Sequence, residues 1–91
     1  MTLCTLYLHF DLPDVHSLKG RRAILNALKE RLKSFNLSLL DISGDYPKEA
    51  ELALAFLSPD AASAAHYKEA ILKMLESRFP HLEYDVDEEC L

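Results

Sequence analysis

The chain has 91 residues, of which 49% are hydrophobic and 27% are charged, and its formal net charge is −5. A chain of this length supports one small hydrophobic core and excludes a deep enclosed pocket beside it. The longest uninterrupted apolar run, residues 52–57, is too short to span a bilayer, and the N-terminus lacks the cationic start of a signal peptide. We therefore expect a cytoplasmic protein with no membrane partner.

The two cysteines, Cys4 and Cys90, lie at opposite ends of the chain and have no CxxC or metal-type spacing. This usage argues for a reducing compartment and against a disulfide scaffold.

The charge is unevenly distributed along the chain. Residues 18–35 hold six of the ten lysines and arginines and one acid, Glu30, so this segment carries +5 and the remainder −10. Much of the acidic excess lies near the C-terminus, in residues 83–89. A modest net charge therefore hides a polarised molecule, which is a property that a binding surface can use.

The first half of the chain predicts one strand, one helix and two further strands. Residues 2–10 alternate between apolar and other side chains, which is typical of a strand. Apolar residues at helical spacing predict a helix over residues 18–35, with Ser17 as its cap and Asn36 after its end. The apolar segments 37–43 and 51–57 predict two strands, joined by a hairpin loop over residues 44–50.

The second half predicts one helix and a last strand. Residues 58–79 have the composition of a helix that is opened by Ser58 or Asp60, with Pro59 in its first turn, and Pro80 stops it. Residues 81–87 alternate between apolar and acidic side chains, which predicts a strand with one acidic face.

The resulting order, βαββαβ, is that of the ferredoxin-like α+β sandwich. We expect one domain over residues 1–91, with an antiparallel sheet in the order 4-1-3-2 and both helices on one face. The start of the first helix and the 44–50 loop then share one edge of the sheet. The first and last strands are neighbours, which brings Cys4 and Cys90 together, and we interpret that pair as incidental rather than redox-active.

Several short motifs resemble the YlxP-like family of small bacterial proteins. The resemblance covers essentially the whole chain and rests on Leu12-Pro13, Ser17-Leu18-Lys19, Arg21-Arg22, Asn36, Ser38, Asp41, Gly44-Asp45, Ala50-Glu51-Leu52, Ser58 and Asp60. Two residues depart from the pattern, because Gly20 replaces an acid and Tyr46 replaces a frequent tryptophan. The resemblance implies a ferredoxin-like fold and a bacterial cytosolic setting near the translation machinery, and it implies no known reaction.

Arg21 falls in the middle of the apolar face of the first predicted helix. An arginine there needs a partner, because an unpaired charge cannot enter the core. If Leu37 and Leu39 point inward from the second strand, Asp41 points the same way, so we predict an Arg21–Asp41 ion pair. The alternatives are ligand binding by Arg21, or the opposite strand phase with Leu40 and Ile42 inward.

A basic stripe on the solvent side of the same helix is the candidate nucleic-acid contact. Arg22, Lys29 and Lys33 share this stripe, and Lys19 lies in the first turn, where a cation opposes the helix dipole. Violations of local rules tend to mark functional sites. We therefore predict a non-catalytic accessory factor that contacts RNA or ribosomal particles through Lys19, Arg22, Lys29 and Lys33. The alternative for these residues is a solvated helix face.

The uncovered face of the sheet supports a second hypothesis. Tyr7 and His9 are expected there beside Glu83 and Asp85, and the acidic neighbours disfavour nucleic acid. Self-association through this face, or along an edge strand, would make the protein a homodimeric interaction module.

Catalysis finds little support in the sequence. The four histidines occur singly, and no nucleophile–base constellation or metal-ligand spacing is present. We expect no catalytic residue, no metal, no cofactor and no small-molecule substrate.

Overall fold

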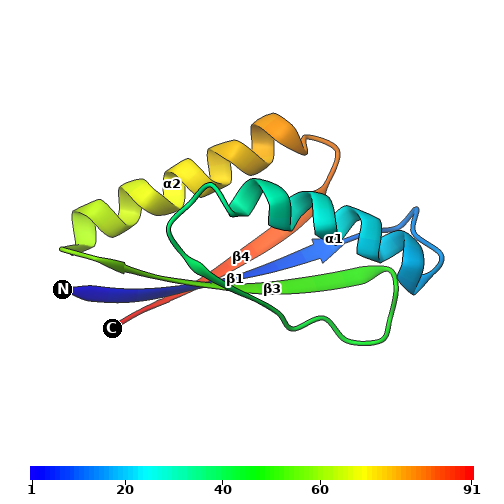
Figure 1. The fold of residues 1–91 in the computed structure, drawn as a ribbon, viewed down its shortest axis with the longest axis horizontal. Coiled ribbons are helices and arrows are strands. Elements are labelled where there is room, and N and C mark those ends of the chain that lie inside the picture. Colours follow the sequence, from blue (N-terminus) through cyan, green and yellow to red (C-terminus); the bar gives the residue numbers. More distant parts are fainter.

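The computed structural model describes all 91 residues and forms an antiparallel sheet with both helices on one side (Figure 1). Its elements are β1 (Thr2–Asp11), α1 (Leu18–Leu32), β2 (Ser38–Asp41), β3 (Glu49–Ser58), α2 (Ala61–Arg78) and β4 (Glu83–Cys90). The strands lie in the order β2-β3-β1-β4, which is the predicted order read from the other edge. The ferredoxin-like βαββαβ prediction is confirmed.

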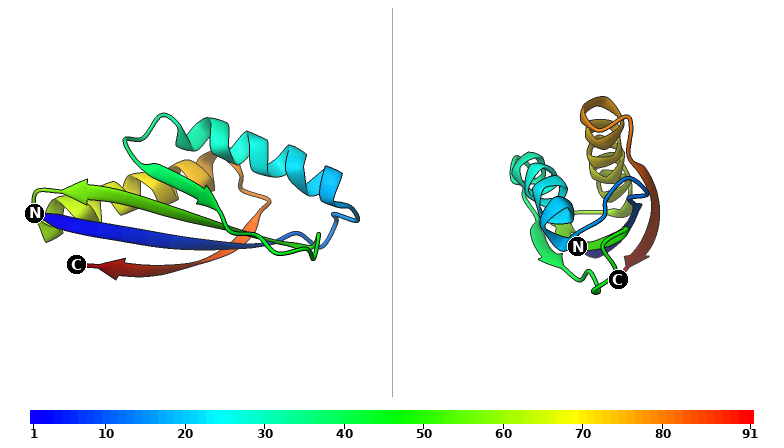
Figure 2. Two further views of the ribbon diagram at one scale, coloured as in Figure 1. Left: turned by 60° about the horizontal axis from the view of Figure 1, so that its bottom comes forward. Right: turned by 90° about the vertical axis from the view of Figure 1, so that its right-hand side faces the viewer.

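The two helices cover different halves of the sheet. Seen end-on, α1 lies on the side of β2 and α2 on the side of β4, and no helix or strand covers the opposite face (Figure 2). Neither helix combines the length and the apolar character that a membrane crossing requires.

The core fills the space between the sheet and the helices. From β1, the alternating residues Cys4, Leu6, Leu8 and Phe10 point toward the helices and are at most 1% exposed. Leu25, Leu28 and Leu32 of α1 meet them at spacings of three and four residues, which place them on one helix face. Each fully buried side chain of this size contributes about 1.5–3 kcal/mol relative to exposure.

The first helix ends earlier than predicted, at Leu32 rather than at Phe35. The hydroxyl of Ser34 donates to the carbonyl oxygen of Arg31 at 2.9 Å, a local bond that competes with helix continuation. Phe35 is thereby free to pack edge-on against Tyr67 of α2, with ring centroids 5.7 Å apart.

The cap of α2 is Asp60, whose carboxylate accepts a 2.7 Å hydrogen bond from the backbone N–H of Ser63. Ser58 instead ends β3, and its hydroxyl donates to the carbonyl oxygen of Asp60. Pro59 therefore precedes the helix and does not lie in its first turn.

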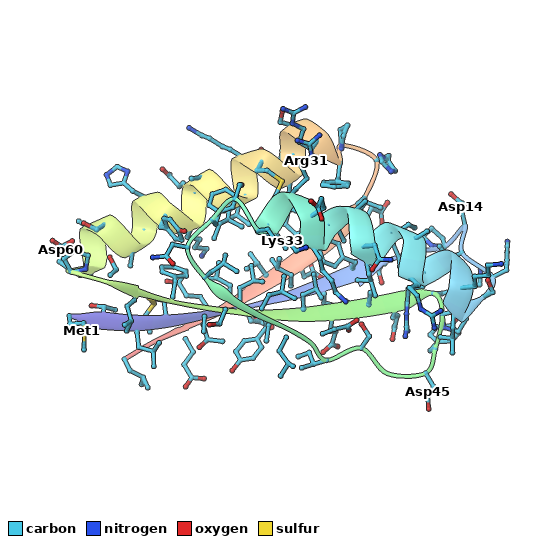
Figure 3. The ribbon with its side chains drawn as sticks, viewed as in Figure 1. Met1, Asp14, Arg31, Lys33, Asp45 and Asp60 are labelled. Atoms are coloured by element: carbon cyan, nitrogen blue, oxygen red, sulfur yellow. A yellow bond between two sulfur atoms is a disulfide. The ribbon has the colours of Figure 1, made fainter.

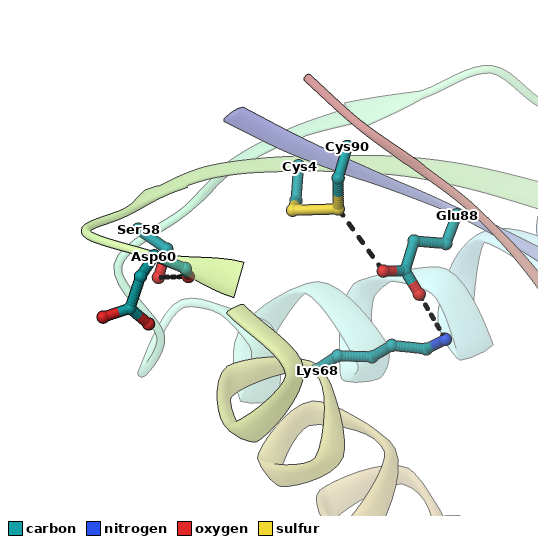
Figure 4. The surroundings of a disulfide bond; sticks show 6 residues. All are labelled: Cys4, Ser58, Asp60, Lys68, Glu88 and Cys90. Atoms are coloured by element: carbon teal, nitrogen blue, oxygen red, sulfur yellow. Dashed lines mark hydrogen bonds and ion pairs between the residues drawn. A yellow bond between two sulfur atoms is a disulfide. The ribbon is translucent and has the colours of Figure 1, made fainter. Parts of the chain in front are cut away.

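Cys4 and Cys90 are brought together as predicted, and they form a disulfide, which corrects the expectation that the chain has none (Figure 4). Antiparallel pairing of β1 with β4 places the two residues directly opposite each other, with Cα atoms 4.1 Å apart. Spacing rules for cysteine motifs are local, so they do not detect a pair that is 86 residues apart in sequence.

Candidate interaction surfaces

Arg21 ties the start of α1 to the β2–β3 connection. Its Nη1 donates to the carbonyl oxygens of Tyr46 at 2.9 Å and Glu49 at 3.0 Å. These carbonyls lie where the chain enters β3, at the sheet edge that the predicted topology assigns to this loop. Arg21 is therefore an architectural residue, as predicted, but its partners are backbone oxygens.

The predicted Arg21–Asp41 ion pair is not formed. Asp41 lies on the helix side of the sheet, as the predicted strand phase requires, and its Oδ2 accepts from Nζ of Lys29 at 3.3 Å. The reason is the rise of the helix, because eight residues separate Arg21 from Lys29 by about 12 Å along the axis. Lys29 thus lies over β2, whereas Arg21 lies beyond its end.

The charge state of Asp41 depends on its partial burial and on its contacts with Ser43 and Lys29. Partial burial raises the pKa of this carboxyl group, but hydrogen bonds from Ser43 and Lys29 outweigh burial and hold the pKa below its usual range. The backbone N–H of Ser43 donates to Oδ1 at 3.0 Å. Asp41 is therefore held as an anion, and its carboxylate forms the ion pair with Lys29.

The four cations of the proposed RNA-binding stripe fall into two pairs. Lys29 is bound to Asp41, and Lys33 lies 3.4 Å from Glu30. Lys19 and Arg22 are exposed and make no hydrogen bond or ion pair. Near them lies an open groove of about 320 Å³, lined by Arg21, Arg22 and Lys29 together with Leu18, Leu25, Asn26 and Asp41. Of the four predicted residues, the two without a partner thus lie in the first two turns of α1, and Arg31 is a further unpaired cation in its last turn.

A further contact in this region was not predicted from the sequence. Nζ of Lys48 donates to the carbonyl oxygen of Pro13 at 2.6 Å and lies 3.5 Å from Nδ1 of His16. It joins the β1–α1 loop to the β2–β3 loop. The sequence pattern does not predict this contact, because Lys48 and the residues that it contacts lie in loops, which have no periodic pattern.

The open face is the side of the sheet that faces away from both helices, and side chains project from it as well as into the core (Figure 3). The pairing register of the four strands shows which residues point to this face. Large apolar residues that are 39–79% exposed form one group, Leu3, Tyr7, Leu40, Ile42, Leu57 and Leu91. Carboxylates form the other group, Asp11, Glu49, Glu51, Glu83, Asp85, Asp87 and Glu89.

The two groups occupy different parts of the open face. The apolar residues lie along β2 and at the end of the sheet where Leu3, Leu57 and Leu91 are neighbours. The carboxylates lie along β4 and at the opposite end of β1 and β3, where Asp11 and Glu49 pair and Glu51 lies opposite His9. Tyr7 and His9 do lie opposite Asp87 and Asp85, so the predicted acidic surroundings of these two side chains are confirmed. The apolar residues of β2 and β3 were not predicted as part of a surface.

Two groups of side chains have the composition of metal ligands. His9, Asp11 and Glu49 offer ligand atoms within 4.8 Å of one another on the open face. Nε2 of His9 is 4.0 Å from Oε1 of Glu49. The register of β1 with β3 creates this group, so no sequence spacing reveals it.

The second group lies beside the disulfide, where Oε1 of Glu88 is 3.3 Å from Sγ of Cys90 (Figure 4). The other oxygen of Glu88 accepts from Nζ of Lys68 at 2.6 Å. With the sulfurs bonded to each other and the carboxylate paired with Lys68, this group is a structural link between β4 and α2.

Comparison with solved structures supports the fold. A protein of unknown function from Nitrosomonas europaea shares 17% identity with a TM-score of 0.58 and covers 100% of this chain and 90% of its own. A protein from Shewanella oneidensis shares 17% identity with a TM-score of 0.59, covering 99% and 91%. A dimeric ferredoxin-like protein from an uncultured marine organism shares 11% identity with a TM-score of 0.54, covering 99% and 91%.

Sequence comparison gives the family. No curated protein matches the chain. A family model described as "Protein of unknown function (DUF503)" matches residues 3–87. Because this match spans nearly the whole chain, the protein belongs to the family described as Protein of unknown function (DUF503).

Proposed function

We propose that this protein is a non-catalytic protein-interaction module whose docking surface is the open face of the sheet. The observation that carries the proposal is the group of six large apolar side chains that stay 39–79% exposed on this face. Leaving apolar area in water costs about 25 cal/mol per Å². Exposed apolar groups that gather on one face, rimmed by polar residues, mark interaction sites in soluble proteins.

One form of such a module is a homodimer, in which a second copy of the chain contacts the apolar residues of this face. The marine relative that is described as dimeric supports this form. Leu40 and Leu57, the most exposed apolar residues within the strands of this face at 63% and 64%, would lie at the centre of such a contact.

Selection of a random-peptide phage library on the immobilised protein tests the module without assuming a partner. Backbone amide shifts in an NMR titration then locate the selected peptides. We expect shifts on β2 and β3 and loss of binding by Leu40→Ser/Leu57→Ser. Shifts confined to the helices, or no selected peptide, would contradict the proposal.

A second candidate function is contact with RNA or ribosomal particles through α1. It is favoured by the side chains of Lys19 and Arg22, which are exposed in the first two turns of α1 and make no ion pair. The resemblance to the YlxP-like family supports the same setting and a cytoplasmic location. The test is salt-sensitive binding that requires Lys19 and Arg22.

A further inference from the structure

The open face carries charge of only one sign. It holds seven carboxylates and no lysine or arginine. Only one of these carboxylates, that of Glu49, lies within ion-pair distance of a basic group, the ring of His9 at 4.0 Å. The others have no ion-pair partner, so the face presents strong negative potential beside its apolar half.

This charge selects among the classes of partner. Nucleic acid would place phosphates against carboxylates, and a second copy of the same face would bring seven more carboxylates to the interface. Facing like charges disfavour association, whereas a basic partner would gain attraction at every one of these sites. The apolar half supplies the contact area that a purely electrostatic surface lacks.

The edge of the sheet beside this face also offers a place for an anchoring side chain. A hollow of about 290 Å³ lies where β2 begins, lined by Leu3, Leu37, Phe56 and Leu57 with Asn36, Ser38 and Ala55. Because β2 begins at Ser38, opposite Ala55, the part of β3 beyond Ala55 has no strand on that side. An apolar side chain of a partner fits beside this unpaired backbone.

We propose that the open face docks a basic amphipathic segment of a different protein. The apolar side chains of that segment lie over Leu40, Leu57 and the hollow, and its lysines or arginines lie over the carboxylates of β4. This inference rests on the proposed interaction function and deepens it, because it names the chemistry of the partner.

Fluorescence anisotropy with labelled synthetic peptides tests the proposal. The probe has about 12 residues, rich in leucine in one half and in lysine in the other, and is long enough to reach from β2 to β4 as an extended chain. Two matched peptides replace every lysine by glutamate or every leucine by serine. We expect the leucine–lysine peptide to bind at least about tenfold more tightly than either of the others, with affinity that falls between about 0.05 and 0.5 M salt.

Paired variants of the protein locate the binding. Asp85→Lys/Asp87→Lys changes the open face, and Glu69→Lys/Glu76→Lys makes the same change of net charge on exposed positions of α2. We expect the first variant to weaken binding at least about tenfold and the second to leave it nearly unchanged. Equal losses in both variants, or equal binding of the leucine–glutamate peptide, would overturn the proposal.

Sedimentation of the wild type separates this inference from the function on which it rests. One outcome is a wild-type dimer that Leu40→Ser/Leu57→Ser converts to a monomer, together with no binding of the leucine–lysine peptide. This outcome would overturn the proposal of a basic partner and support the interaction module. Loss of peptide binding in Leu40→Ser/Leu57→Ser supports both. A monomer that binds none of the peptides overturns both.

Discussion

Arg21 reaches across 25 residues of sequence to the carbonyl oxygen of Tyr46, to which its Nη1 donates a 2.9 Å hydrogen bond. The same nitrogen donates to the carbonyl oxygen of Glu49. Replacing the side chain would leave two carbonyls without their cationic donor, so Arg21→Met should lower the free energy of unfolding by about 1–2 kcal/mol. Arg22→Met removes a neighbouring charge that has no partner and should change it by less than about 0.5 kcal/mol. Chemical denaturation of the two variants makes the comparison, and equal effects would contradict the structural role of Arg21.

The Asp41 carboxylate should make the fold sensitive to acid. Its pKa is lower in the folded chain than in the unfolded chain, because Ser43 and Lys29 favour the anion over the effect of burial. Its contribution to stability is therefore present above the unfolded pKa of about 4 and is lost as the pH falls through the folded value. We expect Asp41→Asn to flatten the decline of unfolding free energy below about pH 4. Asp45→Asn, at the loop tip, serves as the control and should leave the decline as it is.

Reduction of Cys4–Cys90 should destabilise the protein. The bond closes a loop with a sequence separation of 86 residues, so breaking it restores much freedom to the unfolded chain. We expect a reducing agent to lower the free energy of unfolding by about 2–4 kcal/mol. Cys90→Ser should match the reduced wild type and should not respond to the reductant. Identical melting of the oxidised and reduced wild type would show that the disulfide contributes nothing.

Self-association, if a second copy covers the open face, should depend on its apolar half. Leu40→Ser/Leu57→Ser should convert a dimer to a monomer in sedimentation velocity, because both side chains are more than 60% exposed in one copy. Lys29 and Lys33 lie on the helix side, so Lys29→Ser/Lys33→Ser should not change the sedimentation coefficient. A dimer that survives the leucine substitutions would place the contact elsewhere.

Binding to RNA or ribosomes through α1 should depend on the two free cations more than on the two paired ones. In co-sedimentation across a salt series, Lys19→Glu/Arg22→Glu should abolish binding, because phosphate contacts require uncompensated charge. The control variant Lys73→Glu/Arg78→Glu makes the same change in the net charge of the protein on α2 and should retain most of the binding. If wild-type protein does not bind even at low salt, the basic stripe is a solvated surface.

The fold could be predicted from the sequence because its signals are periodic. Alternation in β1 and in the last strand, together with helical spacing in two segments, defines the βαββαβ order, and that order allows few sheet topologies. The phase of β2 stayed open in the sequence, because Leu37 with Leu39 and Leu40 with Ile42 were both possible inward pairs, and the structure places Leu37 and Leu39 against the core.

The contacts of single side chains were harder to predict, and Arg21 shows why. A helical wheel gives the direction of a side chain around the axis but not its height along the sheet, so it did not distinguish Arg21 from Lys29 as the partner of Asp41. The apolar half of the open face was missed for a different reason. Residues 52–57 are apolar on both faces, which favours a fully buried strand, and only the register shows that Leu57 is exposed on the open face.

The two outer strands of the sheet also bear on the solubility of the protein. An outer strand exposes backbone groups that can pair with another chain, which is a route to aggregation. The four residues of β2 give such pairing little length, and β4 carries Asp85, Asp87, Glu88 and Glu89. The protection of β4 against pairing with another chain therefore depends on ionised carboxylates. Strong acid removes this protection and weakens the fold at the same time. The protein should be most prone to form intermolecular sheet in acidic solution.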